Sequence, residues 1–244
     1  KEGIGMSNAF FIDTTRCTGC RGCQVACKQW HDLPAEETQS RGTLENPPDL
    51  SFATYKLVRM RELETDGKLK WLFFPEQCRH CIEPPCLETA DDEAAIYKDE
   101  KTGAVIFTAN TKNLVADEII ESCPYNIPRQ AADGTLAKCD MCNDRVTNGL
   151  PPACVQTCPT GTMNFGDRDQ MVSLAQQRLD QVRKKHAKAQ LVDADEVNVI
   201  YLVAEAPAAY HEFVMASTGA HGLSRHMALR KMVNPFRRVL RQLA

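Results

Sequence analysis

The sequence predicts an α+β fold with two cysteine-rich modules related by a pseudo-twofold axis, followed by a C-terminal helical extension. Two observations carry this prediction. The 12 cysteines fall in short groups with apolar segments of strand length nearby, and a long helical repeat of apolar residues begins only near residue 167. The hydrophobic content of 43% over 244 residues is enough for a packed core.

Five apolar segments have the length and composition of strands. They are residues 8–13, 52–60, 68–74, 103–108 and 197–206. The sequence Glu-Thr-Asp-Gly at 64–67 supplies a turn between the second and the third segment. Short helices are expected around the cysteine loops, at 21–30, 84–90, 114–123 and 151–158.

The C-terminal part of the chain is expected to be mainly helical. Asp167 and Gln170 resemble a helix N-cap and its N3 partner. The apolar residues that then repeat at helical spacing, to about residue 188, are Met171, Leu174, Ala175, Leu179 and Val182. Residues 221–244 form a basic tail with six Lys or Arg and no Asp or Glu. We expect this tail to dock on a partner or on the chain's own core rather than on a membrane surface.

Charge and hydropathy narrow the functional classes. The net charge of -3 gives no reason to expect nucleic-acid binding. No segment approaches the ~18–20 continuous apolar residues that span a bilayer. The opening sequence, KEGIGMSNAFFID, lacks the apolar core of a signal peptide. We therefore expect no transmembrane segment, and export only as the passenger of a signal-bearing partner.

The cysteines fall in four groups. In chain order these are Cys17, Cys20, Cys23 and Cys27; then Cys78, Cys81 and Cys86; then Cys123 alone; and then Cys139, Cys142, Cys154 and Cys158. Disulfides, zinc and iron–sulfur clusters are the candidates for so many thiols. Four thiols within eleven residues do not suit a disulfide framework, and the spacing C-x2-C-x2-C-x3-C is that of bacterial ferredoxins rather than of a zinc site. The last group could be read as a zinc site in isolation, but the first group predicts iron–sulfur clusters.

The ferredoxin spacing also predicts which cysteines share a cluster. In two-cluster modules the fourth cysteine of a run binds the cluster of the other run. The predicted ligand sets are Cys17, Cys20, Cys23 and Cys158; Cys139, Cys142, Cys154 and Cys27; and Cys78, Cys81, Cys86 and Cys123. The chain is thus predicted to hold three [4Fe–4S] clusters, with all twelve cysteines as iron ligands.

A fourth cluster would need ligands that this chain lacks. By the ferredoxin spacing they would stand at Ala90, Asn113, Ala116 and Ile119. All four thiols are absent together, so the twelve cysteines divide into three complete sets with none left over. We predict that apolar groups of the 114–120 segment, such as Leu114, Ile119 and Ile120, fill the space of the missing cluster.

Four strings carry a resemblance to a known family: "CTGCRGCQVACKQWHD", "CRHCIEPPC", "CPYNIPR" and "KCDMCNDRVTNGLPPACVQTCPTG". Over roughly residues 8–166 the chain resembles the four-cluster ferredoxin-like electron-transfer subunits of molybdenum and tungsten oxidoreductases. Within this group it is most similar to the iron–sulfur beta subunit of soluble formate dehydrogenases, through "CRGCQVACKQWH" and "NPPDLSFATYKLVRM". It departs from typical members, which have sixteen cysteines and, when membrane-bound, a C-terminal transmembrane helix.

The resemblance implies two ferredoxin-like modules and an extension. Residues 8–50 with 126–166 would form the module with two clusters, residues 51–125 the module with one cluster, and residues 167–244 a helix, a strand and the basic tail. The implied role is non-catalytic: a separate large molybdopterin subunit, holding tungsten or molybdenum, would oxidise formate, and this chain would relay the electrons to a c-type cytochrome.

The resemblance also implies a heterodimer with that catalytic subunit, exported to the periplasm in the folded state with its partner. The alternative location is the cytoplasm. The alternative functions are an equivalent subunit of another molybdopterin oxidoreductase and a stand-alone polyferredoxin.

Some side chains near the cysteines have two interpretations. Lys138, Arg16 and Lys28 either place a positive charge beside a cluster, where it favours the reduced form, or are solvated or ion-paired. We expect His80 to have a hydrogen-bonding or structural role, because four thiols already complete its site. Residues expected in the core, at an interface or in a solvated loop, rather than in redox chemistry, are Trp30, His31, Trp71, Asp91, Asp92 and Glu93.

Overall fold

The computed structural model describes residues 7–65 and 67–216 and has the expected α+β composition. A four-stranded sheet with the order β8-β1-β10-β9 forms its centre. These strands are β8 (Met163–Asp167), β1 (Asn8–Asp13), β10 (Val199–Val203) and β9 (Gln190–Val192). Strand β1 pairs parallel with β10 and antiparallel with β8, so the two ends of the described chain meet in one sheet. The predicted basic tail at 221–244 lies outside the described residues.

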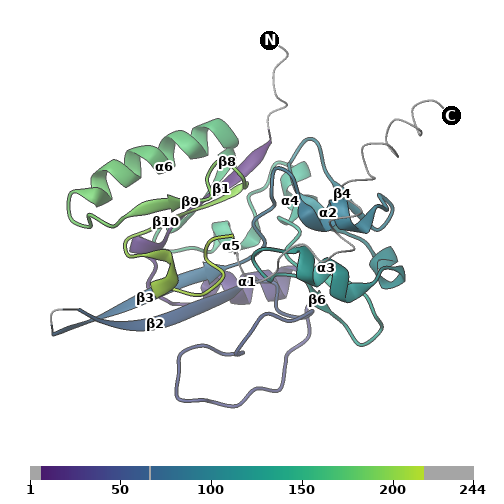
Figure 1. Ribbon diagram of the computed structural model, residues 1–244, viewed down its shortest axis with the longest axis horizontal. Coiled ribbons are helices and arrows are strands. Elements are labelled where there is room, and N and C mark those ends of the chain that lie inside the picture. Colours follow the sequence, from purple (N-terminus) through teal and green to yellow (C-terminus); the bar gives the residue numbers. More distant parts are fainter. Residues whose placement is uncertain (1–6, 66, 217–244) are drawn as a thin grey trace, which may run out of the picture.

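One face of this sheet is covered by helix α6 (Arg168–Arg183), as Figure 1 shows. The carboxylate of Asp167 caps the helix by accepting hydrogen bonds from the backbone N–H groups of Asp169 and Gln170, which confirms the predicted start. The helix ends at Arg183, about one turn before the predicted end. Strands β9 and β10, which follow α6 in the chain, belong to the same sheet as β1, so the segment after residue 167 completes the core that the N-terminal strand begins.

The opposite face of the sheet turns toward the cysteines. Alternate residues of β1 and β10, including Phe10, Ile12 and Tyr201, share one hydrophobic cluster with Cys23 and Cys154. This alternation follows from the two-residue repeat of a strand, because the intervening residues pack under α6. The site therefore rests directly on the central sheet.

A long hairpin, β2 (Leu57–Thr65) and β3 (Lys68–Glu76), packs its base against this face and projects its tip away from the body (Figure 1). The Phe74 ring stacks on the Tyr201 ring at 4.4 Å between centroids, and the Tyr201 hydroxyl donates to the Pro75 carbonyl at 2.6 Å. The first strand of the hairpin begins five residues later than predicted, because Ser51 and Thr54 close a turn with reciprocal backbone hydrogen bonds.

The predicted helices near the cysteine loops are present but shorter than expected. They are α1 (Gly22–Trp30), α2 (Pro85–Ala90), α3 (Ala116–Ser122) and α5 (Ala153–Gln156). The predicted strand at 103–108 is β5 (Val105–Phe107), which pairs with β4 (Ile96–Lys98). Elements that the sequence did not predict are β4, β6 (Arg129–Gln130), β7 (Leu136–Ala137), α4 (Asn143–Thr147), β9 and the 3-10 turns Thr14–Arg16, Ala109–Asn113 and Pro207–Ala209. Each is five residues or shorter, so its own sequence carries little periodicity. Within the described residues, no helix has both the length and the apolar character needed to cross a membrane.

The cap of α6 gives a direct test of how this helix is held. Asp167→Ala removes two side-chain hydrogen bonds and should cost about 1 kcal/mol, which lowers the melting temperature by about 2–4 °C. The matched control is Gln177→Ala, on the exposed face of the same helix. Circular dichroism melts of both variants would contradict the assignment if they shifted equally.

Candidate iron–sulfur centres

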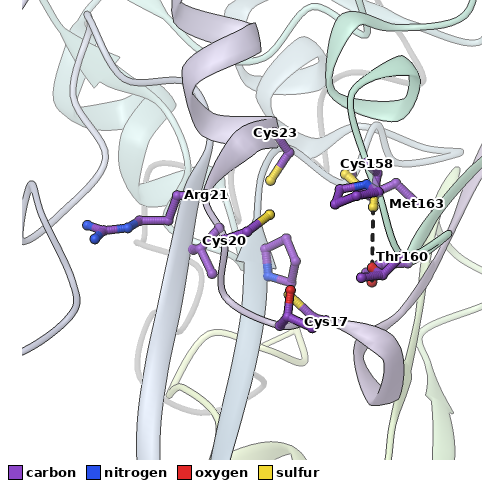
Figure 2. A pocket seen from close by; sticks show the side chains of 12 residues that line it. Cys17, Cys20, Arg21, Cys23, Cys158, Thr160 and Met163 are labelled. Carbon is purple, nitrogen blue, oxygen red and sulfur yellow. Dashed lines mark hydrogen bonds between the residues drawn. The ribbon is translucent and has the colours of Figure 1, made fainter.

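All twelve cysteines carry free thiols, and eight of them line two cavities of four cysteines each. Cys17, Cys20, Cys23 and Cys158 line one cavity, which we call site 1. Figure 2 shows Cys20, Cys23 and Cys158 pointing toward one another, while Arg21 points away from them. Cys17 and Cys20 lie in the loop before α1, and Cys23 lies in its first turn. Cys158 lies before β8, the neighbour of β1 in the sheet. The pairing of β1 with β8 thus brings Cys158 to the first run.

Cys78, Cys81, Cys86 and Cys123 line a second cavity, which we call site 3. Like site 1, this cavity is lined by four cysteines, as expected for two sites of one kind. Cys86 lies in α2 and Cys123 directly follows α3, and these two helices pack against each other. The lone Cys123 therefore completes this group of thiols.

The remaining four cysteines, Cys27, Cys139, Cys142 and Cys154, form site 2. Cys27 belongs to α1 and Cys154 to α5, and these helices are in contact. Burial raises the pKa of Cys27 well above its usual value, and repulsion from Cys154 and Cys142 raises it further. Burial and then the nearby Cys27 thiol raise the pKa of Cys139 in the same way. The four thiols are thus close enough to act on one another.

Three C-x2-C turns, from Cys17 to Cys20, from Cys78 to Cys81 and from Cys139 to Cys142, share one backbone feature. The residue before the second cysteine is left-handed in all three: Gly19 at φ 68°, His80 at φ 47° and Met141 at φ 67°. Its N–H points back at the first cysteine, with N···S distances of 3.4 Å from His80 to Cys78 and from Met141 to Cys139. In site 1 the Gly19 N–H makes the equivalent contact with the Cys17 sulfur. Burial raises the pKa of the Cys17 thiol, and the hydrogen bond from Gly19 lowers it. Such N–H···S contacts stabilise thiolate ligands and help to set the potential of a cluster.

The fourth cysteines of sites 1 and 3, Cys158 and Cys123, are each followed by the same kind of turn. Cys123 and Cys158 are each followed by proline and, two residues later, by a left-handed residue, Asn126 at φ 49° or Gly161 at φ 66°. The sulfur of Cys158 lies 3.7 Å from the Thr160 hydroxyl. Two equivalent turns thus deliver the fourth thiol to site 1 and to site 3.

The burial of the cysteine thiols suits a metal group that binds thiolate ligands. Burial raises the pKa of Cys23, Cys86 and Cys142 to about 12 and that of Cys123 to about 11. Such thiols are protonated at neutral pH unless a metal replaces the proton. The donor set and its burial therefore match iron–sulfur ligation.

Two buried lysines stand among the thiols. Lys138 is 6% exposed, and its Nζ donates to the carbonyls of Val105 and Cys139. Its position excludes a solvated side chain and confirms the interpretation that places a charge beside the cysteines. Lys56, which the sequence analysis missed, is 2% exposed, and its Nζ donates to the Gln77 side chain. A lysine inside the apolar segment 52–60 was the available signal for it.

Arg16 and Lys28, the other two cations near the cysteines, are ion-paired. Arg16 is 48% exposed and ion-paired with Asp13 at 3.6 Å, and Lys28 is ion-paired with Glu36 at 3.3 Å. Neither therefore offers an uncompensated charge to a cluster.

The histidines and tryptophans divide between site and surface. His80 is fully buried, and its Nδ1 accepts a hydrogen bond from the Val105 N–H at 3.0 Å, in the structural role expected for it. His31 reaches site 2 instead of remaining in the core, with its Nε2 3.6 Å from the Cys142 sulfur and 3.3 Å from Asp140. Trp30 and Trp71 are about half exposed. The acidic run at 91–93 lies in an exposed loop, as predicted.

The predicted place of the missing fourth cluster is filled by apolar side chains. Ala90, from α2, shares one hydrophobic cluster with residues of α3 and its preceding loop. The members predicted to fill this space and found there are Leu114, Ile119 and Ile120. Ala116 belongs to the same cluster, so three of the four positions that would carry ligands, Ala90, Ala116 and Ile119, carry side chains of this apolar cluster.

Comparison with known proteins agrees with this site. The family of 4Fe-4S dicluster domains matches residues 69–168. The formate dehydrogenase subunit beta of Megalodesulfovibrio gigas is 57% identical over 215 residues, which cover 86% of this chain and 100% of that protein. The chain belongs to the family of formate dehydrogenase beta subunits. Two further family members are the formate dehydrogenase 2 subunit beta (cytochrome c-553) of Nitratidesulfovibrio vulgaris, 52% identical over 85% of this chain and 98% of that protein, and the nitrate-inducible iron–sulfur subunit of Escherichia coli, 37% identical over 83% and 71%.

Membership of this family assigns the chain its general role. It is an iron–sulfur electron-transfer subunit of a formate dehydrogenase, and it works with a catalytic partner subunit. When bound, [4Fe–4S] clusters supply one-electron redox chemistry. The residues of this chain hold, insulate and electrostatically tune those centres.

Gly19 tests the turn of site 1. A Cβ at this position would lie 2.5 Å from the Phe73 ring, and the left-handed backbone would cost a further ~1–2 kcal/mol. Gly19→Ala should therefore disturb site 1 and remove about four irons per chain. The matched control is Gly22→Ala, where the nearest atom lies 3.7 Å away. Full iron content in the first variant, or equal loss in both, would contradict the role of this turn.

Ala90 tests the assignment of the missing site. Ala90→Cys restores one of four absent thiols, and Asn113, Ala116 and Ile119 supply none. The variant should therefore bind no more iron than the parent chain, by colorimetric iron assay. An increase of about four irons per chain would show that the pairing of cysteines is wrong.

Proposed function

We propose that this subunit relays electrons through three [4Fe–4S] clusters, from the catalytic molybdopterin subunit to a c-type cytochrome. The ligands would be Cys17, Cys20, Cys23 and Cys158 in site 1; Cys27, Cys139, Cys142 and Cys154 in site 2; and Cys78, Cys81, Cys86 and Cys123 in site 3. One observation carries the proposal: eight of the twelve free thiols line two cavities of four cysteines each, and the remaining four interact electrostatically with one another.

The sites form a row with site 2 in the middle. Burial raises the pKa of Cys23 in site 1, the Lys56 ammonium lowers it, and repulsion from Cys154 of site 2 raises it further. On the other side, the Cys139 thiol of site 2 interacts with Cys78 of site 3. Neighbouring sites close enough to interact electrostatically suit electron transfer from cluster to cluster. The relay order that this supports is site 1, site 2, site 3 or its reverse.

The domain organisation follows from the same repeat. We propose one module of residues 8–50 and 126–166 with sites 1 and 2, and a second of residues 51–125 with site 3. The equivalent turns after Cys123 and Cys158 support a pseudo-twofold relation between the two. Residues 167–216 extend the first module, because β10 pairs with β1.

The partners and location extend the family assignment. A one-to-one heterodimer with the tungsten- or molybdenum-containing subunit is proposed, and the name of the Nitratidesulfovibrio relative, which includes cytochrome c-553, supports a c-type cytochrome as acceptor. The proposed location is the periplasm. Because unpaired thiols persist in a reducing compartment and form disulfides in an oxidising one, the clusters should be inserted before export with the partner.

Iron and acid-labile sulfide per chain test the cluster number. The intact protein should contain about twelve irons and about twelve sulfides for each copy of this chain, after the partner's own content is subtracted. A value near sixteen, a value near eight, or bound zinc would overturn the three-cluster relay. Purification of this chain as a stable monomer that exchanges electrons alone would favour the polyferredoxin alternative.

A further inference from the structure

Two buried ammonium groups lie in the two gaps of the row of sites. Lys56 is buried two residues before Val58, which lines the cavity of site 1 and packs in one cluster with Cys23 of site 1 and Cys154 of site 2. Lys138 lines the cavity of site 3, and its Nζ donates to the carbonyl of Cys139 in site 2. Each lysine is therefore shared by two neighbouring sites, and site 2 has one on either side.

The protein holds both ammonium groups in fixed places. The Lys56 Nζ donates to Gln77, whose own chain neighbour is the ligand Cys78. The Lys138 Nζ lies 4.7 Å from the centroid of the Phe107 ring and donates to two carbonyls, one of them at 3.0 Å on Cys139. A buried lysine with defined donor contacts has lost the mobility that lets a surface lysine be screened by water.

Neither charge is neutralised by a carboxylate contact. Among the described residues, the ion pairs of the protein include neither Lys56 nor Lys138. Asp140 attracts Lys138 from further away and is partly exposed. Burial of a cation without a compensating anion is strongly unfavourable. The anions that face both lysines are the thiolates of the cysteines, which form when metal binds.

We propose that Lys56 and Lys138 are electrostatic bridges of the relay, each stabilising the reduced state of the two clusters between which it lies. Reduction adds one negative charge to a cluster, and a second reduced cluster nearby repels that charge. A cation between two clusters attracts both added electrons and offsets their mutual repulsion. Neighbouring clusters can then be reduced at similar potentials, which favours rapid passage of electron pairs released by one formate. This inference rests on the three-cluster relay proposed above.

The test is a redox titration of the complex of this chain with its catalytic subunit, followed by electron paramagnetic resonance. Lys56→Met should lower the reduction equilibrium constants of clusters 1 and 2 about tenfold, or about 59 mV each, and leave cluster 3 unchanged. Lys138→Met should lower those of clusters 2 and 3 and leave cluster 1 unchanged. The control is Lys28→Met, which removes an ion-paired lysine next to the ligand Cys27 and should shift no potential.

The pattern of shifts separates the possible outcomes. Unchanged potentials in both methionine variants, or equal shifts at all three clusters, would overturn the bridging role. If a methionine variant fails to retain iron, the corresponding arginine variant decides: recovery of iron and potentials supports a role of charge, and the same failure overturns it. Iron content of the parent complex is measured first, so a cluster number other than three would refute the relay itself rather than the role of the lysines.

Discussion

The structure depends on bringing four thiols to each site from two distant parts of the chain. Cys158 reaches the run that begins at Cys17 because β8 pairs with β1, and Cys27 reaches Cys154 because α1 packs on α5. The central sheet is the common support, since alternate residues of β1 and β10 face the thiols. Short elements are enough for this fold because each cluster, once bound, would cross-link segments that are weakly held by their own packing.

The second constraint is charge. Thiolate ligands bring several negative charges into the interior, where each costs far more than at the surface. Two kinds of group in this chain offset the negative charge. They are the backbone N–H groups of the left-handed residues Gly19, His80 and Met141, and the buried lysines Lys56 and Lys138. Burial raises the pKa of most of the thiols, so metal binding, loss of protons and compensation by the lysines belong together. The N–H dipoles and lysine charges that stabilise the buried thiolates also change the energy of an electron added to a cluster.

Cysteine spacing was sufficient to predict which cysteines line the two cavities and the apolar filling beside Ala90, because a cluster imposes its geometry on the sequence. Apolar runs were sufficient for β1, β10 and the start of α6. The pairing of β10 with β1 was not foreseen, since strands from the two ends of the chain carry no mark of their partner. Lys56 was missed because a single charged residue in a strand pattern is usually exposed. His31 was assigned to the core or an interface, because contact with Cys142 depends on how two loops meet.

The central claim is that each site is closed by a cysteine from another run. A crystal structure of the complex with its catalytic subunit, with an iron anomalous-difference map, tests this most directly, because the map locates the iron atoms without assuming a pairing and the electron density shows which cysteines bind them. We predict three cluster positions in this chain: one bonded by Cys158 with the run at Cys17, one by Cys27 with Cys154, and one by Cys123 with the run at Cys78. A fourth position beside Ala90, or a cluster ligated within a single run, would contradict the account.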